Sequence, residues 1–243
     1  MGSKCSATLF QVNNLGGKVG MQHALDWFFK HEHFGLIVED DVVIHPSAPL
    51  ILEKALLGTI DRKRIGSISL HNPLPRNSQH PSILNAKESL YPMIWGWATW
   101  AETWWLYKKE IDESRIRIAF LVLRQRHMNL VAKKYWIVKF IQSKSNETWD
   151  TQLLYTHWKN NLKTLTFDMN LATNIGFDER ATRTKKHRDI QEITGDEIKL
   201  EKLKINNLPE DGKRDRALAN TVWGLSYGNG IKNLQRRLMS IIN

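Results

Sequence analysis

Phe34-Gly35-Leu36-Ile37-Val38 is a short apolar run that ends abruptly in three carboxylates, Glu39-Asp40-Asp41. This pattern is typical of a buried parallel strand whose carboxyl end delivers acidic side chains into the crevice where open α/β sheets bind ligands. Apolar residues at helical spacing predict a helix before it, over 20–33, and another after it, over 47–57. A second strand is predicted over 65–70. This alternation predicts a layered α/β domain.

Length and composition suit one sizeable domain. The chain has 243 residues, of which 42% are hydrophobic and 25% charged, so a disulfide-stapled miniprotein and wholesale disorder are excluded. The net charge of +10 and the pI near 9.7 predict an anionic partner, such as a nucleotide, a phosphate, a nucleic acid or an acidic membrane surface. The single cysteine, Cys5, and the lack of a signal-peptide pattern or a bilayer-spanning apolar run predict a cytoplasmic protein without a transmembrane helix.

The acidic triplet is the first candidate site. Glu39, Asp40 and Asp41 lie between apolar segments, where they repel one another unless a cation or hydrogen-bond donors offset their charge. Such oxygen ligands suit Mg²⁺ or Mn²⁺, which nucleotide enzymes hold through one or two carboxylates, waters and substrate phosphates. A solvated strand end is the alternative. His45, which follows shortly after, is either a further ligand or a loop histidine.

A tryptophan-rich segment is the second candidate. Its sequence is Ile94-Trp95-Gly96-Trp97-Ala98-Thr99-Trp100, with Trp104 and Trp105 close behind. Aromatic faces stack on sugars and bases, indole N–H groups donate hydrogen bonds, and a glycine lets backbone approach a ligand closely. We therefore expect Trp95, Gly96 and Trp97 to line a binding site, whereas Trp100 and Trp104, at helical spacing, are expected in the core.

Two later segments complete the set. Glu147-Thr148-Trp149-Asp150 opens a helix predicted to run through Trp158, so Asp150 is either a first-turn charge, with Thr148 as the cap, or a carboxylate base for an acceptor hydroxyl. Asn174-Ile175-Gly176-Phe177 precedes residues 180–188, which carry five fixed positive charges and no acid. Arginine and hydroxyl side chains with backbone N–H groups form the usual cradle for a diphosphate; a solvated basic loop is the alternative.

These four segments, in this order, resemble the nucleotide-sugar transferases of the GT-A fold. The resemblance is to bacterial glycosyltransferases with an acidic triplet, a Trp-Gly-Trp-Ala-Thr-Trp box, a Trp-Asp segment and an Asn-Ile-Gly-Phe segment. It runs from Phe10 to Thr184 and includes Asn14-Leu15-Gly16. A more distant likeness is to the inverting N-acetylglucosaminyltransferases that act on protein glycans.

The resemblance implies a mixed, mostly parallel sheet flanked by helices and a metal-dependent, inverting hexosyl- or N-acetylhexosaminyltransferase with a lipid-linked or glycan acceptor. The implied roles are as follows: Asp41 holds Mn²⁺ or Mg²⁺; Asp40 holds the metal or the ribose; Glu39, Trp95, Gly96 and Trp97 contact the nucleotide sugar; Asp150 is the base; and Thr182, Arg183 and Thr184 meet the diphosphate.

Two departures from that family bear on the donor site. Only nine residues precede Phe10, so either the sequence is truncated at its N-terminal edge or the chain has lost the strand and helix that usually come first and help to bind the nucleobase. Arg183 replaces a histidine of the family, and a permanent cation favours direct phosphate contact over metal ligation. A noncatalytic GT-A-like binding module is therefore the alternative to the enzyme.

The remaining sequence suggests two further features. Residues 114–146 hold eight Lys and Arg, interleaved with aromatic residues, and no Asp or Glu, which predicts either a membrane-surface element on the inner membrane face or a solvated helical pair. Residues 1–188 are expected to form the transferase domain, and residues 189–243 a charged extension with a loosely docked helix. A nucleic-acid-binding protein is not expected, since no binding motif is present and three acids lie at the site.

Overall fold

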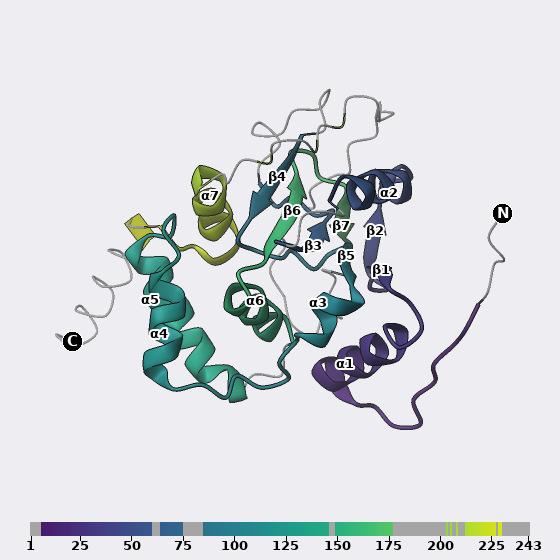
Figure 1. Ribbon diagram of the computed structural model, residues 1–243, viewed down its shortest axis with the longest axis horizontal. Helices are drawn as coiled ribbons and strands as arrows, with labels where there is room; N and C mark the ends of the chain where they lie inside the picture. The colour runs from purple at the N-terminus through teal and green to yellow at the C-terminus, as the bar shows by residue number, and fades with distance from the viewer. Residues whose placement is uncertain are drawn as a thin grey trace.

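A computed structural model describes residues 6–59, 64–74, 85–145, 149–176, 203, 205, 208, 212–226 and 228–229. Figure 1 shows the strands at the centre of the molecule with helices around them. In chain order, the elements are α1 (Gly16–Phe28), β1 (Phe34–Ile37), β2 (Val42–Ile44), α2 (Ala48–Thr59), β3 (Ile65–Ser69), β4 (Ala86–Ser89), β5 (Trp97–Trp100), α3 (Ala101–Trp105), α4 (Arg115–Leu123), α5 (Leu130–Ile141), the 3-10 helix η2 (Gln142–Ser145), α6 (Asp150–Lys159), β6 (Lys163–Phe167), β7 (Ala172–Asn174) and α7 (Gly212–Trp223).

The main sheet has the strand order β1-β5-β3-β6-β4, and β2 and β7 form a separate two-stranded sheet. The predicted α/β class is confirmed. The prediction of mostly parallel pairing is wrong for the described strands, because only β3 and β6 pair in parallel, whereas β1–β5, β5–β3, β4–β6 and β2–β7 are antiparallel. Two of these antiparallel pairs arise because β5, the tryptophan-rich strand, enters between β1 and β3 in the opposite direction.

Helices cover both faces of this sheet, as the alternation along β5 demonstrates. Ala98 belongs to a buried cluster with α2 residues such as Ile51, whereas Trp97 belongs to a cluster with α1, α3 and α6. Successive side chains of a strand point to opposite faces, so these two clusters lie on opposite sides of the sheet. The result is a helix–sheet–helix sandwich.

The helix α1 begins four residues before the predicted start and ends at Phe28. Its start is earlier because the side chain of Asn14 accepts a hydrogen bond from the backbone N–H of Gly16, at 2.8 Å. The helix packs closely on β1, since a Cβ atom at Gly35 would lie 2.2 Å from the ring of Phe28. This contact fixes α1 against the strand that leads into the acidic triplet.

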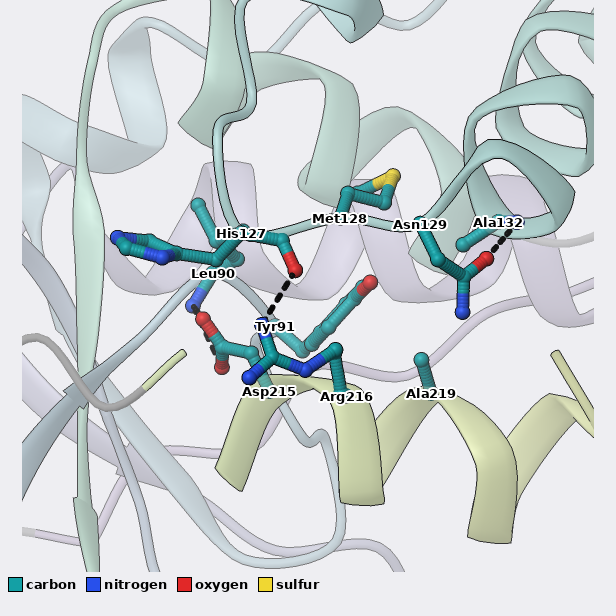
Figure 2. A pocket seen from close by; sticks show the side chains of 9 residues that line it. All are labelled: Leu90, Tyr91, His127, Met128, Asn129, Ala132, Asp215, Arg216 and Ala219. Carbon is teal, nitrogen blue, oxygen red and sulfur yellow. Dashed lines mark hydrogen bonds between the residues drawn. The ribbon is translucent and has the colours of Figure 1, made fainter. Parts of the chain in front are cut away.

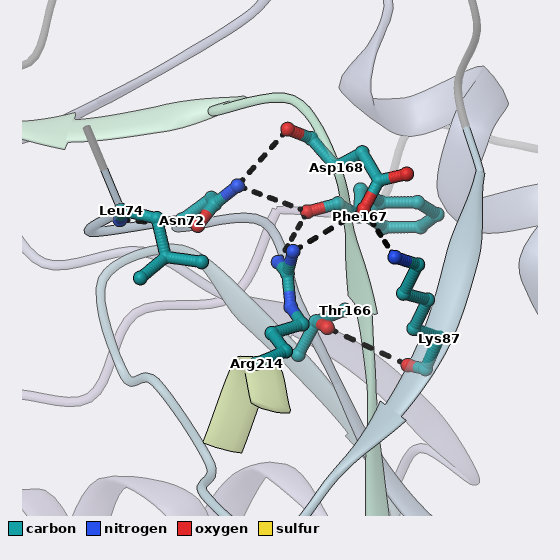
Figure 3. Close-up of polar contacts among 7 residues, drawn as sticks. All are labelled: Asn72, Leu74, Lys87, Thr166, Phe167, Asp168 and Arg214. Atoms are coloured by element: carbon teal, nitrogen blue, oxygen red, sulfur yellow. Dashed lines mark hydrogen bonds and ion pairs between the residues drawn. The ribbon is translucent and has the colours of Figure 1, made fainter. Parts of the chain in front are cut away.

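The helix α7 is anchored by buried charges rather than loosely docked. Arg214 donates to the backbone carbonyl of Phe167 at 2.7 Å and to the Asp168 carboxylate at 3.2 Å (Figure 3). The neighbouring Asp215 accepts hydrogen bonds from the Ser89 hydroxyl and the Leu90 backbone N–H. This part of the predicted charged extension is therefore integral to the described fold.

The predicted basic helical pair corresponds to α4 and α5. Ile118, Leu121 and Val122 of α4 enter the same buried cluster as Trp136 and Phe140 of α5. In the described part of the chain, no helix is long and apolar enough to cross a membrane.

Candidate functional site

The carboxyl ends of β1 and β3 define one end of the sheet. Ile37, the last residue of β1, pairs with Trp97, and Ser69, the last residue of β3, pairs with the same residue. The acidic triplet follows β1 after one residue, Val38, so it leaves the sheet beside the start of the tryptophan-rich strand. This end of an α/β sheet is where ligands usually bind.

The acidic triplet and the Asn-Ile-Gly segment lie in contact, although they are far apart in sequence. Val42 pairs with Asn174, and the Ile175 N–H donates to the Asp41 carbonyl at 2.8 Å. A Cβ atom at Gly176 would lie 2.4 Å from Oδ2 of Asp41, so only glycine leaves room for this carboxylate. Two of the four predicted segments are thus brought together.

The carboxylate of Asp41 is an unusual polar group at this end of the sheet. Its Oδ1 atom is buried and has no hydrogen-bond partner within the described residues. A buried oxygen without a donor is costly, and a cation would offset that cost. Of the other two acids, Asp40 is exposed and Glu39 is half-buried.

The two predicted ligand-facing tryptophans, Trp95 and Trp97, lie in different environments. Trp97 is only 1% exposed and stacks on Trp149 at 5.6 Å between ring centroids, so it packs in the core and presents no open face. Trp95 is half-buried and stacks on His71 at 4.5 Å. Of the two predicted ligand-facing indoles, Trp95 alone keeps surface exposed to solvent.

Gly96, between them, has a positive φ of 63° and lies against the two-stranded sheet. A Cβ atom there would lie 2.9 Å from that of Ala172 in β7. The Gly96 carbonyl also accepts from the Leu70 N–H at 2.9 Å, which ties the segment to the end of β3. The glycine therefore serves close packing inside the protein. As expected, Trp104 is in the core, with Nε1 donating to Asp26 at 2.8 Å.

Asp150 is the first residue of α6, next to the Trp149 that stacks on Trp97. Its carboxylate is exposed, and Oδ1 accepts from the Thr151 N–H at 2.9 Å. Trp149 occupies the cap position without a side-chain cap, while Thr148, the predicted cap, lies outside the described residues. The Trp97–Trp149 stack links Asp150 to the same end of the sheet as the acidic triplet.

Tyr107 positions the start of α6, and sequence reasoning missed it. Its hydroxyl donates to the Trp149 carbonyl at 3.2 Å and accepts from the Gln22 side chain at 3.1 Å. Burial, with a smaller contribution from the charge of Asp150, raises the pKa of Tyr107 to about 12, so the hydroxyl stays protonated and can donate. No local signal singles out this tyrosine, because its partners lie 42 and 85 residues away.

The remaining predicted residues divide into two groups. His45 is buried, and its Nδ1 accepts from the Ser47 N–H at 3.0 Å just before α2, which favours a loop role over metal ligation. Thr182, Arg183 and Thr184 lie outside the described residues.

A narrow hollow with no enclosed room for a water molecule lies at the opposite end of the sheet (Figure 2). It lies beside Leu90, which follows the Ser89–Thr164 pair at the amino end of β6. Its wall includes the buried carboxylate of Asp215 and the side chain of Arg216, which donates to the His127 carbonyl at 3.3 Å. Because it contains none of the predicted site residues, it is not part of the candidate site.

Comparison with known proteins places the chain in no family, since no protein-family model and no curated protein matches it.

Proposed function

We propose that the protein is a metal-dependent glycosyltransferase that moves a sugar from a nucleoside-diphosphate donor to a hydroxyl acceptor in the synthesis of surface glycans or glycoconjugates. The observation that carries the proposal is the contact between Asp41 and Gly176, which joins the acidic triplet to the segment that leads into the basic residues 180–188. A carboxylate site next to a cationic, hydroxyl-rich segment suits a diphosphate with its counter-ion.

The residues present fit a divalent cation. Within the described residues no three His, Cys, Asp or Glu side chains are grouped as a complete metal site. However, Mg²⁺ and Mn²⁺ in nucleotide enzymes need only one or two protein carboxylates, because waters and substrate phosphates complete the shell. The buried, unpartnered Oδ1 of Asp41 would supply one ligand and the exposed Asp40 a second. When bound, the cation would neutralise charge on the departing nucleoside diphosphate.

The side chains of this protein would do the rest of the chemistry. Asp150 accepts the proton of the acceptor hydroxyl as its oxygen bonds to the anomeric carbon of the donor sugar. The bond from that carbon to the diphosphate oxygen breaks in the same step, and its electron pair leaves with the nucleoside diphosphate. Glu39 and Trp95 adjoin the donor, while Thr182, Arg183 and Thr184 contact its diphosphate.

The edge position of β1 favours a second candidate, a noncatalytic GT-A-like module that binds a sugar or a partner. Within the described residues β1 pairs on one side only, with β5. An open edge next to the acidic triplet is where a nucleobase-binding strand would otherwise continue the sheet. This module would keep the fold without binding nucleotides tightly.

Titration calorimetry with a panel of nucleoside diphosphates, with and without Mn²⁺, tests the proposal. We expect one nucleotide to bind in an Mn²⁺-dependent manner, and Asp41→Asn to abolish that binding without lowering the urea midpoint of unfolding. The matched control is Asp112→Asn, an exposed carboxylate before α4, which should bind like the wild type. Wild-type affinity in Asp41→Asn would remove Asp41 from the metal site, and the absence of binding by every nucleotide would favour the noncatalytic module.

A further inference from the structure

The helix α4 carries an apolar stripe on its solvent side. Ile116, Phe120 and Leu123 recur at intervals of four and three residues, so they lie on one face of the helix. They are 69%, 69% and 50% exposed. The opposite face already supplies Ile118, Leu121 and Val122 to the core, so the exposed stripe is not needed to hold α4 in place.

The helix α5 extends this apolar surface. Leu130 and Val138 are 68% and 44% exposed, and they share a face with Lys134 because all three are spaced by four residues. The end of α4 adjoins the start of α5, since the Lys133 ammonium group donates to the Leu123 carbonyl at 3.0 Å. We call these five apolar residues, Ile116, Phe120, Leu123, Leu130 and Val138, the α4–α5 surface.

The cations of this region divide into engaged and available groups. Arg117 forms an ion pair with Glu113, Arg124 donates to the Trp158 carbonyl, and Lys133 is held by Leu123. By contrast, four cations have no hydrogen bond or ion pair to any residue that the structure describes: Arg115, Arg126, Lys134 and Lys139. With no acid between residues 114 and 146, the field around the α4–α5 surface is positive.

We propose that the α4–α5 surface docks the protein onto an anionic lipid bilayer. The bilayer interface matches both the apolar stripe and the positive charge around it, because it presents phosphate and carboxylate groups above an apolar layer. Ile116, Phe120 and Leu123 enter the boundary between headgroups and acyl chains, and Arg115 and Lys134 contact the anionic headgroups. A nucleic acid matches the charge but offers no apolar layer for the stripe.

Sedimentation with large vesicles tests this proposal. The probes are vesicles of phosphatidylcholine alone and of an equal mixture of phosphatidylcholine and phosphatidylglycerol. We expect the protein to bind the anionic vesicles, with an affinity that falls as salt is added. Arg115→Gln and Lys134→Gln should each weaken binding about fivefold, which is the loss expected for one cation at an anionic surface. Lys30→Gln, an exposed lysine after α1, is the charge control and should bind normally.

The apolar contribution has its own variant and control. Phe120→Ser should reduce binding to anionic vesicles about tenfold or more, as expected when most of a buried phenylalanine contact is lost. Leu57→Ser replaces a leucine on α2 that is 65% exposed, and it should bind like the wild type. Urea midpoints should be unchanged in both variants, because both side chains are exposed.

Four results would overturn the proposal. One is equal binding to neutral and anionic vesicles, and another is an equal loss of binding in Leu57→Ser and Phe120→Ser. The third is a wild-type protein that ignores vesicles but forms dimers that Phe120→Ser dissociates, which would make the surface a contact between copies of this chain. Duplex DNA that competes with vesicles for the wild type, and binds Phe120→Ser equally well, would likewise replace the bilayer as partner.

Discussion

Asp150 is an exposed carboxylate at the first position of α6. The two roles considered for it predict different effects of the substitution Asp150→Asn. If it is the base, Asp150→Asn keeps its shape but cannot take the proton, so turnover should fall about 10²- to 10⁴-fold with donor affinity barely changed. If it only complements the helix dipole, the substitution costs at most about 1 kcal/mol of stability and leaves turnover alone. Sugar transfer at saturating donor separates the two.

Glu102→Gln provides the control for that measurement. Glu102 is also an exposed carboxylate in the first turn of a helix, α3. It should lose a similar, small amount of stability and retain full turnover. Comparable turnover in Asp150→Asn and the wild type would remove Asp150 from the catalytic role.

Gly176 offers a way to disturb Asp41 without changing a charge. An added methyl group would lie 2.4 Å from Oδ2 of Asp41, so Gly176→Ala must push that carboxylate aside. We expect weaker Mn²⁺-dependent nucleotide binding with the net charge unchanged. Gly20→Ala is the control, since its methyl group would contact nothing within 4 Å, and it should stabilise α1 by about 0.5–1 kcal/mol. Equal nucleotide affinity in the two variants, by calorimetry, would show that the Asp41–Gly176 contact is unimportant.

At the scale of single residues, the sequence predicted the place of the acidic triplet in the fold better than the burial of the tryptophans. The acidic triplet was correctly placed at the end of a strand, because an apolar run followed by carboxylates is a local pattern. The burial of Trp97 was not predicted, since it depends on Trp149, 52 positions further along the chain. An exposed indole and a buried one look the same in sequence.

Among the elements, α7 depends on a carboxylate in an unfavourable environment. Burial raises the pKa of Asp215 from 3.8 to about 6, although hydrogen bonds from Ser89 and Leu90 partly oppose the shift. The folded state therefore holds this proton more tightly than the unfolded chain does. The stability it contributes is fully present below pH 3.8 and is lost as the pH rises to about 6.

Asp215→Asn should remove this pH dependence, because the amide cannot ionise and its oxygen still accepts from Ser89 and Leu90. We expect the variant to gain about 3 kcal/mol relative to the wild type between pH 4 and pH 7.5, as measured by urea unfolding. A difference between the two proteins that is the same at both pH values would contradict the assignment.

Local patterns explain which elements the sequence predicted well. The helix α2 and the strand β3 agree with the predictions to within two residues, because their apolar spacing is regular. By contrast, β5 was not predicted to run between β1 and β3, since strand order depends on contacts between distant segments. Burial of Arg214 and Asp215 was also missed, because charged residues are buried only when distant partners satisfy them, here Asp168 and Ser89.

For the whole molecule, the buried side chains of His157 and Asp215 make the stability change with pH in opposite directions. Burial lowers the pKa of His157 from 6.5 to about 4, with Nε2 and the Ser67 hydroxyl 2.9 Å apart. Protonation of His157 is therefore unfavourable in the folded state. The stability that its neutral imidazole contributes is present above pH 6.5 and is lost as the pH falls to about 4. Asp215 acts in the opposite sense over much of the same range.

The two single variants should therefore show slopes of opposite sign. Between pH 6 and pH 4, Asp215→Asn should lose about 2 kcal/mol of stability and His157→Gln should gain about 2 kcal/mol, because only the histidine term remains in the first and only the aspartate term in the second. Urea unfolding at both pH values gives the slopes. Slopes of the same sign would mean that one of the two groups titrates as it does in the unfolded chain.

The pairing of β2 with β7 has a consequence for the protein during its synthesis. Val42 and its partner Asn174 are about 130 residues apart, so a ribosome adding about 5–20 residues per second needs roughly 7–26 s to make the second strand after the first. Throughout this interval the nascent chain carries an apolar, unpaired strand beside three like charges. An unpaired strand is the part of a chain most prone to pair with the wrong neighbour. The time for which the growing chain is at risk of aggregation therefore depends on the speed of translation through residues 45–172. It depends less on the stability of the finished protein.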